Sequence, residues 1–223
     1  MSAPTDTPNR LLEVARELFA QRGYEGTTVR DIAVAAEANL AAVGYHFGSK
    51  QGLYEEVLRS QVAPLGRRLA QVCRAKMPPL DRIEAIVHAV FEHIRMRPQM
   101  PAIIARELAS GREINAAMAG TFREILPVLT GVIVEGQKDG SIRAGDPTLL
   151  ALSVMSQPIY FNLARPVIAA VAGLEVGDPE TAGRMAVHAA AVIRAGLAAP
   201  CAPGAATAAP AARAPAHRKA GAR

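Results

Sequence analysis

The sequence predicts an all-α protein in which a small N-terminal domain of three helices precedes a larger helical domain. Hydrophobic residues make up 50% of the 223 residues, while aromatic residues make up 4%. Alanine dominates, and Val, Ile and Thr are not gathered in the alternating runs that strands show. Apolar residues instead recur at helical spacing between proline and glycine breaks, which is typical of helices.

The first two helices are predicted from their end signals. Thr7-Pro8 places a capping hydroxyl before a proline at the first helical position, and Gly23 ends the helix that follows. Thr28 and Asp31 have the spacing of a capping box, in which each side chain accepts a hydrogen bond from the other's backbone N–H. A second helix is therefore expected to begin directly after Thr28.

A third and a fourth helix follow closely. Asn39 is placed to cap the third helix, and Gly48 ends it. Ser49 caps a long fourth helix that runs to about Lys76, in which Pro64 is expected to cause a kink. Two short helices separated by a tight turn form a helix-turn-helix, whose second helix enters the major groove of DNA.

Helical patterns continue through the larger domain, with Pro127 expected to interrupt one helix and Pro158 expected inside another. These later helices are predicted over residues 80–97, 100–110, 113–138, 147–172 and 180–197.

The composition changes after residue 197. Ala, Pro and Gly dominate the remaining residues, together with four basic side chains. This composition predicts a disordered tail, with a non-specific DNA-binding arm as the alternative. The predicted organisation is a helix-turn-helix domain over 1–50, a ligand-binding and dimerisation domain over 51–197, and a tail over 198–223.

The positive charge of the chain is not concentrated in the N-terminal domain. The formal net charge is +5 and the pI is near 9.6, yet residues 1–60 hold six Lys and Arg against eight Asp and Glu. This segment therefore carries 6 − 8 = −2. Because a basic patch is the usual electrostatic signature of nucleic-acid binding, DNA recognition here must depend on a few well-placed groups.

Several functional classes find no support in the residues. Cys73 and Cys201 stand far apart, and His88 and His93 do not share a helix face, so neither zinc nor another metal is expected. No phosphate loop, HExxH or nucleophile elbow is present, so we expect neither an enzyme nor a cofactor. The chain shows no signal peptide and no apolar run of membrane-spanning length, which favours the cytoplasm.

The segment 39–47 has two faces suited to reading DNA. Val43 and Phe47 lie on its buried side, while small or polar residues on its outer side let the backbone approach base edges. Apolar carbons near its beginning can contact thymine methyl groups, and donors near its end can reach phosphates. The first group is Leu40, Ala41 and Ala42, and the second is Tyr45, His46 and Lys50.

Two stretches resemble the N-terminal domain of the TetR/AcrR family of bacterial transcriptional regulators. They are Gly23–Ala33 (GYEGTTVRDIA) and Tyr45–Tyr54 (YHFGSKQGLY), within a similarity that covers roughly residues 8–58. The resemblance implies an all-helical homodimer that binds a near-palindromic double-stranded operator and is released by a small molecule. It also implies phosphate contacts at Thr27 or Thr28, Tyr45, His46 and Lys50, base proximity at Leu40, Ala41 and Ala42, and a cap at Asn39 that can touch DNA.

Two residues depart from the family pattern. Glu37 occupies a turn position where the family often has glycine, so a left-handed backbone is less comfortable there. Gly44 stands where many members have a tyrosine or another hydrogen-bonding residue, so one phosphate contact is missing. A glycine inside a helix also costs about 1 kcal/mol relative to alanine. These departures predict modest DNA affinity, or a recognition helix that orders fully on DNA.

Two stretches of the larger domain place polar groups among apolar ones, as ligand pockets do. They are 103–108 and 157–166, and they resemble, less specifically, a TetR subgroup with an Arg-Glu pair and an aromatic-rich later helix. Two arginines would suit an anionic or carboxylate-bearing effector. The alternative is a buried Arg–Glu pair that fixes helix packing, or dimer contacts. The candidate ligand-binding residues are Arg106, Gln157, Phe161 and Arg165.

The predicted function is that of a TetR-like repressor released from its operator by a small molecule. In the family the last two helices pair across a two-fold axis, which would place 147–172 and 180–197 in a dimer interface; alternatively they complete the monomer core. A non-specific architectural DNA-binding protein is the first rival function, and a helical enzyme is the second.

Overall fold

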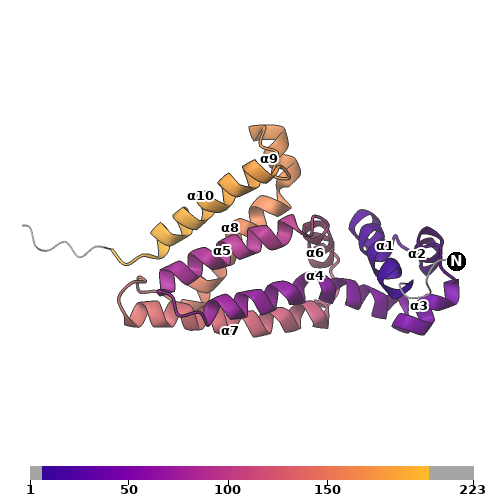
Figure 1. The fold of residues 1–223 in the computed structure, drawn as a ribbon, viewed down its shortest axis with the longest axis horizontal. Coiled ribbons are helices and arrows are strands. Elements are labelled where there is room, and N and C mark those ends of the chain that lie inside the picture. Colours follow the sequence, from indigo (N-terminus) through magenta and orange to yellow (C-terminus); the bar gives the residue numbers. More distant parts are fainter. Residues whose placement is uncertain (1–6, 201–223) are drawn as a thin grey trace, which may run out of the picture.

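The computed structural model describes residues 7–200, and these residues form ten α-helices and no strand (Figure 1). The all-α prediction is therefore confirmed. The helices are α1 (Thr7–Arg22), α2 (Val29–Ala35), α3 (Leu40–Phe47), α4 (Lys50–Cys73), α5 (Pro79–Arg95), α6 (Met100–Ala109), α7 (Ala116–Lys138), α8 (Pro147–Leu163), α9 (Arg165–Ala172) and α10 (Pro179–Leu197).

The molecule is elongated, with the three short N-terminal helices at one end (Figure 1). Helix α4 has 24 residues, about 36 Å at 1.5 Å per residue, and it connects this end to the rest of the molecule. Its beginning packs on α1 and α3, and its later turns pack on α5 and α7. A single rigid element therefore links the helix-turn-helix to the larger domain.

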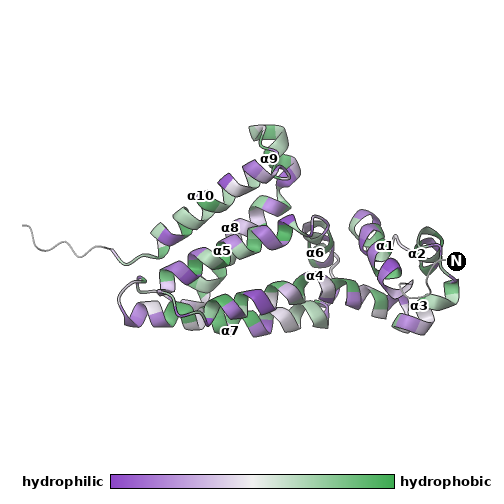
Figure 2. Ribbon diagram, in the orientation of Figure 1, coloured by the Kyte–Doolittle hydropathy of each residue, from purple (hydrophilic) through white to green (hydrophobic). Residues whose placement is uncertain are grey.

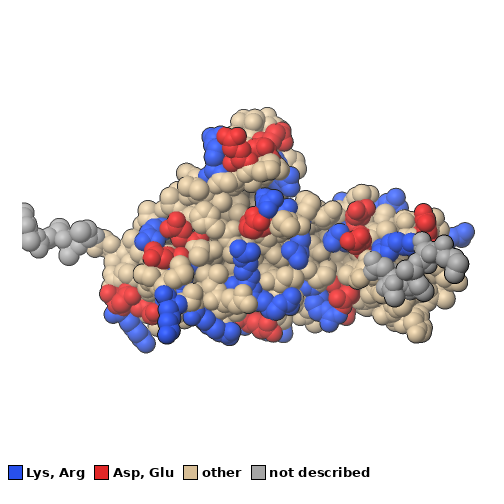
Figure 3. All heavy atoms as spheres, viewed as in Figure 1, with Lys and Arg blue, Asp and Glu red and all other residues tan. Residues whose placement is uncertain are grey.

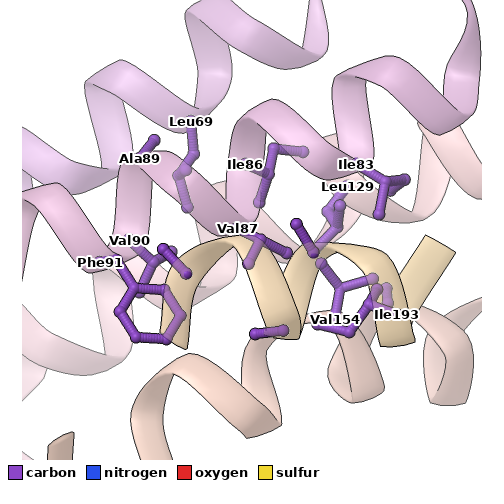
Figure 4. Close-up of a cluster of buried hydrophobic side chains, with 14 of the residues drawn as sticks. Leu69, Ile83, Ile86, Val87, Ala89, Val90, Phe91, Leu129, Val154 and Ile193 are labelled. Carbon is purple, nitrogen blue, oxygen red and sulfur yellow. The ribbon is translucent and has the colours of Figure 1, made fainter. Parts of the chain in front are cut away.

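Two hydrophobic cores lie along this axis. The N-terminal core gathers buried residues of α1 to α4, and it also includes Ile103 from α6. The larger core lies between α4, α5, α7, α8 and α10, with Val87 and Val90 of α5 near its centre (Figure 4). Hydrophobic and hydrophilic residues alternate along α4, α5 and α7, as expected of helices with one buried side (Figure 2).

The predicted helix caps are present. Thr28 and Asp31 form the reciprocal capping box at the start of α2. Asn39 caps α3 and Ser49 caps α4, each through a side-chain oxygen that accepts a backbone N–H. Gly23 has a positive φ of 74° at the end of α1. Local sequence therefore sets the boundaries of the helix-turn-helix.

The predicted interruption at Pro127 was wrong, the position of Pro158 inside a helix is confirmed, and the predicted helix over 147–172 is too long. Helix α7 continues through Pro127, where the flanking Ile125 and Leu129 are buried in the core and hold the helix together. The predicted helix over 147–172 is divided at Ala164 into α8 and α9, although Pro158 lies inside α8. Pro166 explains this break, because a proline has no N–H to donate to the carbonyl four residues earlier and its ring clashes with that carbonyl.

Helix α7 is long and apolar enough to cross a membrane, judged by length and composition alone. Its most apolar window is 33% buried, and α7 packs against α4 and α8. Arg123 and Glu124 lie inside it, so the apolar sequence is not uninterrupted. Its buried residues Ile125, Leu129, Val132 and Ile133 belong to the larger core.

The first residues after α10 are ordered. Ala198 pairs with Ile142 as an isolated β-bridge, and the Ala199 N–H donates to the Ser141 carbonyl over 3.0 Å. The predicted tail beyond residue 200 lies outside the described residues.

Candidate nucleic-acid interface and ligand cavity

Helix α3 presents a small and polar outer face. Tyr45 is 85% exposed and Leu40 is 55% exposed, whereas Val43 is buried against the N-terminal core. Ala41 and His46 are also exposed, and Ala42 and Phe47 are partly buried. This arrangement leaves the backbone of α3 accessible, which close approach to base edges requires.

The beginning of α3 is fixed by Asn39. Its Oδ1 accepts the Ala41 N–H over 2.8 Å, so the side-chain oxygen serves as a helix cap. The side-chain amide of Asn39 takes no part in this bond and lies at the exposed N-terminal end of α3. A capping role and a DNA contact are therefore compatible at this residue.

The two threonines before α2 differ sharply. Thr27 is fully buried, and its hydroxyl donates to the carbonyl of Gly23 over 2.8 Å, with the Leu18 carbonyl at 3.3 Å. A phosphate contact by Thr27 is thus excluded in this conformation, because its side chain satisfies buried carbonyls at the end of α1. Thr28 is exposed, and its hydroxyl donates to Asp31 over 2.7 Å. Of the two candidates, only Thr28 lies at the surface.

Lys50 lies at the start of α4, next to the end of α3. Its ammonium stands over the Tyr24 ring, 4.1 Å from the ring centroid, which is a cation–π contact. The rings of Tyr45 and His46 lie edge to face, 4.9 Å apart. The three predicted phosphate donors therefore surround the C-terminal end of the recognition helix.

The turn between α2 and α3 has a strained residue. Glu37 has a positive φ of 49°, and it is the one non-glycine residue with positive φ in the described chain. The Arg10 guanidinium, from α1, donates to the Glu37 carbonyl over 3.0 Å. The sequence predicted an uncomfortable left-handed turn here, and the backbone confirms it.

Replacing Glu37 with glycine is expected to raise the free energy of unfolding by about 1 kcal/mol. Glycine adopts the left-handed region without the Cβ clash, and this gain exceeds its added flexibility in the unfolded chain. Urea unfolding followed by circular dichroism measures the change. Glu37→Ala is the control, since alanine keeps the Cβ; an equal gain in that variant would contradict the backbone explanation.

The charges near this surface are mixed. On the face drawn in Figure 3, Lys and Arg lie interspersed with Asp and Glu over the N-terminal helices, without a continuous basic patch. This distribution agrees with the net charge of −2 over residues 1–60. Attraction between this surface and DNA phosphates would therefore come from individual hydrogen-bond donors and not from an overall positive charge.

Helix α6 connects the N-terminal helices to the larger domain. Arg106 donates to the carbonyls of Ala20 and Gln21, over 3.0 Å and 2.7 Å, and so satisfies the open C-terminal end of α1. Glu107 is 3% exposed, and Ile103 is part of the N-terminal core. One face of α6 is therefore embedded in the DNA-binding domain.

Glu107 is the centre of a buried polar cluster. Its carboxylate accepts the Tyr54 hydroxyl over 2.7 Å, the Arg112 guanidinium over 3.2 Å and the Asn115 N–H over 3.2 Å. These three donors come from α4, from the loop after α6 and from the start of α7. The predicted alternative, a buried Arg–Glu pair that fixes helix packing, is present as Glu107 with Arg112, whereas Arg106 binds other partners.

Burial, followed by the hydrogen bond to Glu107, raises the pKa of the Tyr54 hydroxyl. Because the pKa of Tyr54 is higher in the folded protein, its contribution to the free energy of unfolding is complete below the pKa of tyrosine in the unfolded chain, about 10. That contribution is lost as the pH rises from there toward the pKa in the folded protein.

Stability is therefore expected to fall above pH 10 by up to about 1.4 kcal/mol per pH unit from Tyr54 alone. Urea unfolding at pH 8, 10 and 11 tests this, with Tyr54→Phe expected to show a shallower decline. The exposed Tyr45→Phe variant should match the parent protein, and an equal decline in Tyr54→Phe would contradict the prediction.

An apolar cavity opens on the other side of α6. Its volume is about 70 Å³, and it lies within about 690 Å³ of empty space that includes open solvent at its mouth. Ile104, Ala105 and Leu108 of α6 line it, opposite residues of α4, α5, α7 and α8. Thr121 and Asn162 are the polar residues in its wall. The same short helix thus contacts both the cavity and the DNA-binding domain.

The predicted ligand-binding residues do not converge on this cavity. Arg106 lies at the end of α1, as described above, and Phe161 packs against Phe91 in the core with ring centroids 6.4 Å apart. Gln157 does not line the cavity, and its buried Oε1 has no hydrogen-bond partner within the described residues. Arg165 lines a smaller neighbouring pocket of about 60 Å³.

Sequence reasoning missed most of the cavity wall. The predicted stretches 103–108 and 157–166 supply Ile104, Ala105 and Leu108 of α6 and Ile159, Asn162 and Leu163 of α8, whereas the wall residues of α4, α5 and α7 were part of ordinary helical patterns. The cavity is formed by residues of five helices that leave a gap between them, so most of its wall residues have no recognisable pattern in the local sequence.

The helix-turn-helix with an exposed recognition helix, joined to a helical domain with an apolar cavity, defines a ligand-responsive DNA-binding regulator of transcription. The family model of bacterial regulatory proteins of the tetR family matches residues 11–57, and the tetracyclin repressor-like C-terminal domain matches residues 79–193. The second match alone spans half of the chain. The chain belongs to the tetR family, and it is a DNA-binding transcriptional repressor that responds to a ligand.

Relatives support this assignment. The HTH-type transcriptional repressor KstR2 of Mycolicibacterium smegmatis is 32% identical over 145 residues, which cover 64% of this chain and 70% of KstR2. The HTH-type transcriptional regulator RutR of Escherichia coli is 25% identical over 169 residues, which cover 75% of this chain and 79% of RutR.

Solved structures share the fold. The ketosteroid transcriptional regulator KstR2 of Mycobacterium tuberculosis has a TM-score of 0.70 at 24% identity, over 88% of this chain and 97% of that one. FadR from Bacillus subtilis, solved in complex with stearoyl-CoA, has a TM-score of 0.69 at 15% identity, over 84% of this chain and 98% of FadR.

Proposed function

We propose that this repressor acts in the cytoplasm as a homodimer, and that an amphiphilic anion entering the α6 cavity releases it from a near-palindromic operator. The observation that carries the proposal is the double role of α6, which lines the cavity with one face and packs into the DNA-binding domain with the other. A ligand that displaces α6 would change the position of the recognition helix.

The DNA contacts we propose follow from exposure. Ala41, with Leu40 and Ala42 beside it, would approach the bases, because these residues leave the backbone of α3 accessible. The proposed phosphate contacts are Thr28, Asn39, Tyr45, His46 and Lys50. Two such helices in a dimer would read two half-sites about one helical turn of DNA apart.

An anionic effector is supported by Arg165. This residue makes no ion pair within residues 7–200, and its pocket shares Ile94 and Asn162 with the apolar cavity. Arg95 also lines that pocket, but the Nε and Nη2 groups of its guanidinium both donate to Glu92. An apolar body in the cavity could therefore extend a carboxylate or phosphate toward Arg165.

A dimer is supported by exposed apolar residues on the last helices. Side chains that a monomer would leave in water lie along α8, α9 and α10. They are Leu149, Leu152, Tyr160, Val167, Val171, Val187 and Val192.

Selection of bound duplexes from a random pool tests the DNA half of the proposal. Enrichment of a palindromic sequence is expected, while equal affinity for unrelated duplexes would favour a non-specific architectural protein instead. Turnover of a bound ligand would favour the helical enzyme.

Paired ligands test the effector half of the proposal. Long-chain carboxylates and neutral alcohols of equal length are compared for release of the selected duplex. Arg165→Ala should weaken the carboxylate about tenfold or more and leave the alcohol unchanged, since a hydrogen bond to a charged group contributes about 1.5–3 kcal/mol. If Arg165→Ala weakens the carboxylate and the alcohol equally, Arg165 does not bind the charged group of the effector.

Filling the cavity is expected to weaken the response to the effector. Ala105→Phe places an aromatic ring in the cavity, so the effector should lose affinity by about tenfold or more, equivalent to 1.4 kcal/mol. Affinity for the selected duplex is measured by fluorescence anisotropy with and without effector. Ala144→Phe, in the exposed loop after α7, is the control; an unchanged response in Ala105→Phe would place the effector elsewhere.

A further inference from the structure

Two cations from different parts of the chain contact a single aromatic ring, that of Tyr24. The Lys50 ammonium is 4.1 Å from the ring centroid, and the Arg112 guanidinium carbon is 4.4 Å from it. Lys50 begins α4 next to the recognition helix, whereas Arg112 lies in the loop between α6 and α7. The Tyr24 ring therefore joins a residue of the DNA-binding surface to a residue of the larger domain.

Arg112 is held in place by several groups. Its guanidinium pairs with buried Glu107 over 3.2 Å and approaches Glu25 at 3.7 Å. It also lies over the Tyr54 ring, 5.7 Å from the centroid. The Tyr24 and Tyr54 rings are 4.9 Å apart, and Tyr54 donates to the same Glu107 carboxylate. Arg112, Glu107 and the two rings form one connected cluster.

Lys50 has fewer restraints. No carboxylate within residues 7–200 forms an ion pair with it, and the contact that positions its ammonium is the Tyr24 ring. A lysine side chain has many rotamers, so a surface lysine without a partner loses more conformational freedom when it binds a phosphate. The position of the Tyr24 ring therefore determines how far the Lys50 side chain is already restricted before it binds DNA.

We propose that Arg112 is a positioning residue for DNA binding, which fixes the Tyr24 ring and through it the Lys50 ammonium. The proposal rests on the proposed function, in which Lys50 contacts a phosphate. Glu107, which anchors Arg112, lies on α6 next to the cavity residue Leu108. An effector that shifts α6 would thus loosen Arg112 and weaken a phosphate contact, in addition to moving the recognition helix as a whole.

The position of Lys50 can be measured without DNA. The chain has four lysines, so ¹³C-dimethylation of the full-length protein gives few NMR signals, and loss of a signal in Lys50→Arg assigns Lys50. The ring current of Tyr24 should shift the Lys50 signal upfield of the other lysines. Arg112→Gln should move this signal toward the others, while Arg106→Gln, a second cation that joins α6 to the N-terminal helices, should leave it in place.

A double-mutant cycle connects this position to DNA affinity. Duplexes of random sequence suffice, because a phosphate contact acts on all sequences alike. In the parent protein Lys50→Ala should weaken binding by about twofold to fivefold per protomer, the range for one exposed cation–π or phosphate interaction. In the Arg112→Gln background the same substitution should weaken binding by less than half as much, whereas in the Arg106→Gln background its effect should be unchanged.

The outcomes separate this inference from the proposed function. If the parent protein binds no duplex, the proposed function fails, and the NMR signal still reports whether Arg112 positions Lys50. If DNA is bound but the effects of Lys50→Ala and Arg112→Gln are additive, Arg112 has only a structural role and the inference is overturned. A Lys50 signal that coincides with the other lysines in the parent protein overturns it as well. Thermal melts establish that each variant is folded.

Discussion

Glu107→Ala is expected to lower the free energy of unfolding by about 3 kcal/mol or more. The substitution leaves the Tyr54 hydroxyl and the Asn115 N–H without their acceptor, and it leaves Arg112 without its carboxylate. Arg112 is 35% exposed and keeps Glu25 at 3.7 Å, so most of the loss comes from the two unsatisfied buried groups, each of which costs about 1–3 kcal/mol. Urea unfolding at pH 7, followed by circular dichroism, measures the loss.

Two further variants test whether the loss of stability comes from the hydrogen bonds of Glu107. Glu107→Gln keeps an acceptor oxygen and nearly the same volume, so it should lose less stability than Glu107→Ala. Glu124→Ala, at an exposed position of α7, should change stability by less than about 0.5 kcal/mol. Equal stability of Glu107→Ala and the parent protein would show that the buried cluster does not hold the two domains together.

Ala41→Glu is expected to abolish specific DNA binding, with a loss of about 100-fold or more in affinity. Ala41 is exposed near the beginning of α3, where we propose that the backbone lies against base edges. A carboxylate there faces phosphates and fills the space needed for close approach. A lost contact of about 1–3 kcal/mol in each of two half-sites accounts for the magnitude.

The measurement is a titration of the selected duplex by the full-length protein. Ala144→Glu adds the same charge in the exposed loop after α7, at the end of the molecule away from the recognition helix, and should bind as the parent protein does (Figure 1). Ala41→Ser is expected to keep affinity for some duplexes and change the preferred base. If Ala41→Glu binds normally, α3 does not lie in the major groove as proposed.

The sequence predicted the helix-turn-helix in detail because its signals are local. The capping box of Thr28 and Asp31, the Asn39 cap and the strained Glu37 each depend on residues within a few positions of one another. Such signals are visible in a single sequence, and the structure confirms each of them.

The remaining errors concern contacts between a residue and a different element of the fold. Thr27 was predicted as a possible phosphate contact beside Thr28, but α1 buries it. Arg106 was predicted in a ligand pocket, yet its partners, Ala20 and Gln21, lie more than 80 positions earlier in the chain. The cavity is also formed by five helices together. The spacing of apolar residues and the composition assign a residue to one face of a helix, but they do not identify the element that packs on that face.

The place of Ile103 in the N-terminal core has a practical consequence for engineering. Regulators of this kind invite modular exchange, in which one DNA-binding domain is fused to another ligand-binding domain to build a sensor. Here the boundary cannot be drawn at the end of α3, because α6 supplies part of the core that the first helices need. A chimaera would have to carry over Ile103, Arg106 and Glu107, so the transferable unit is discontinuous in sequence.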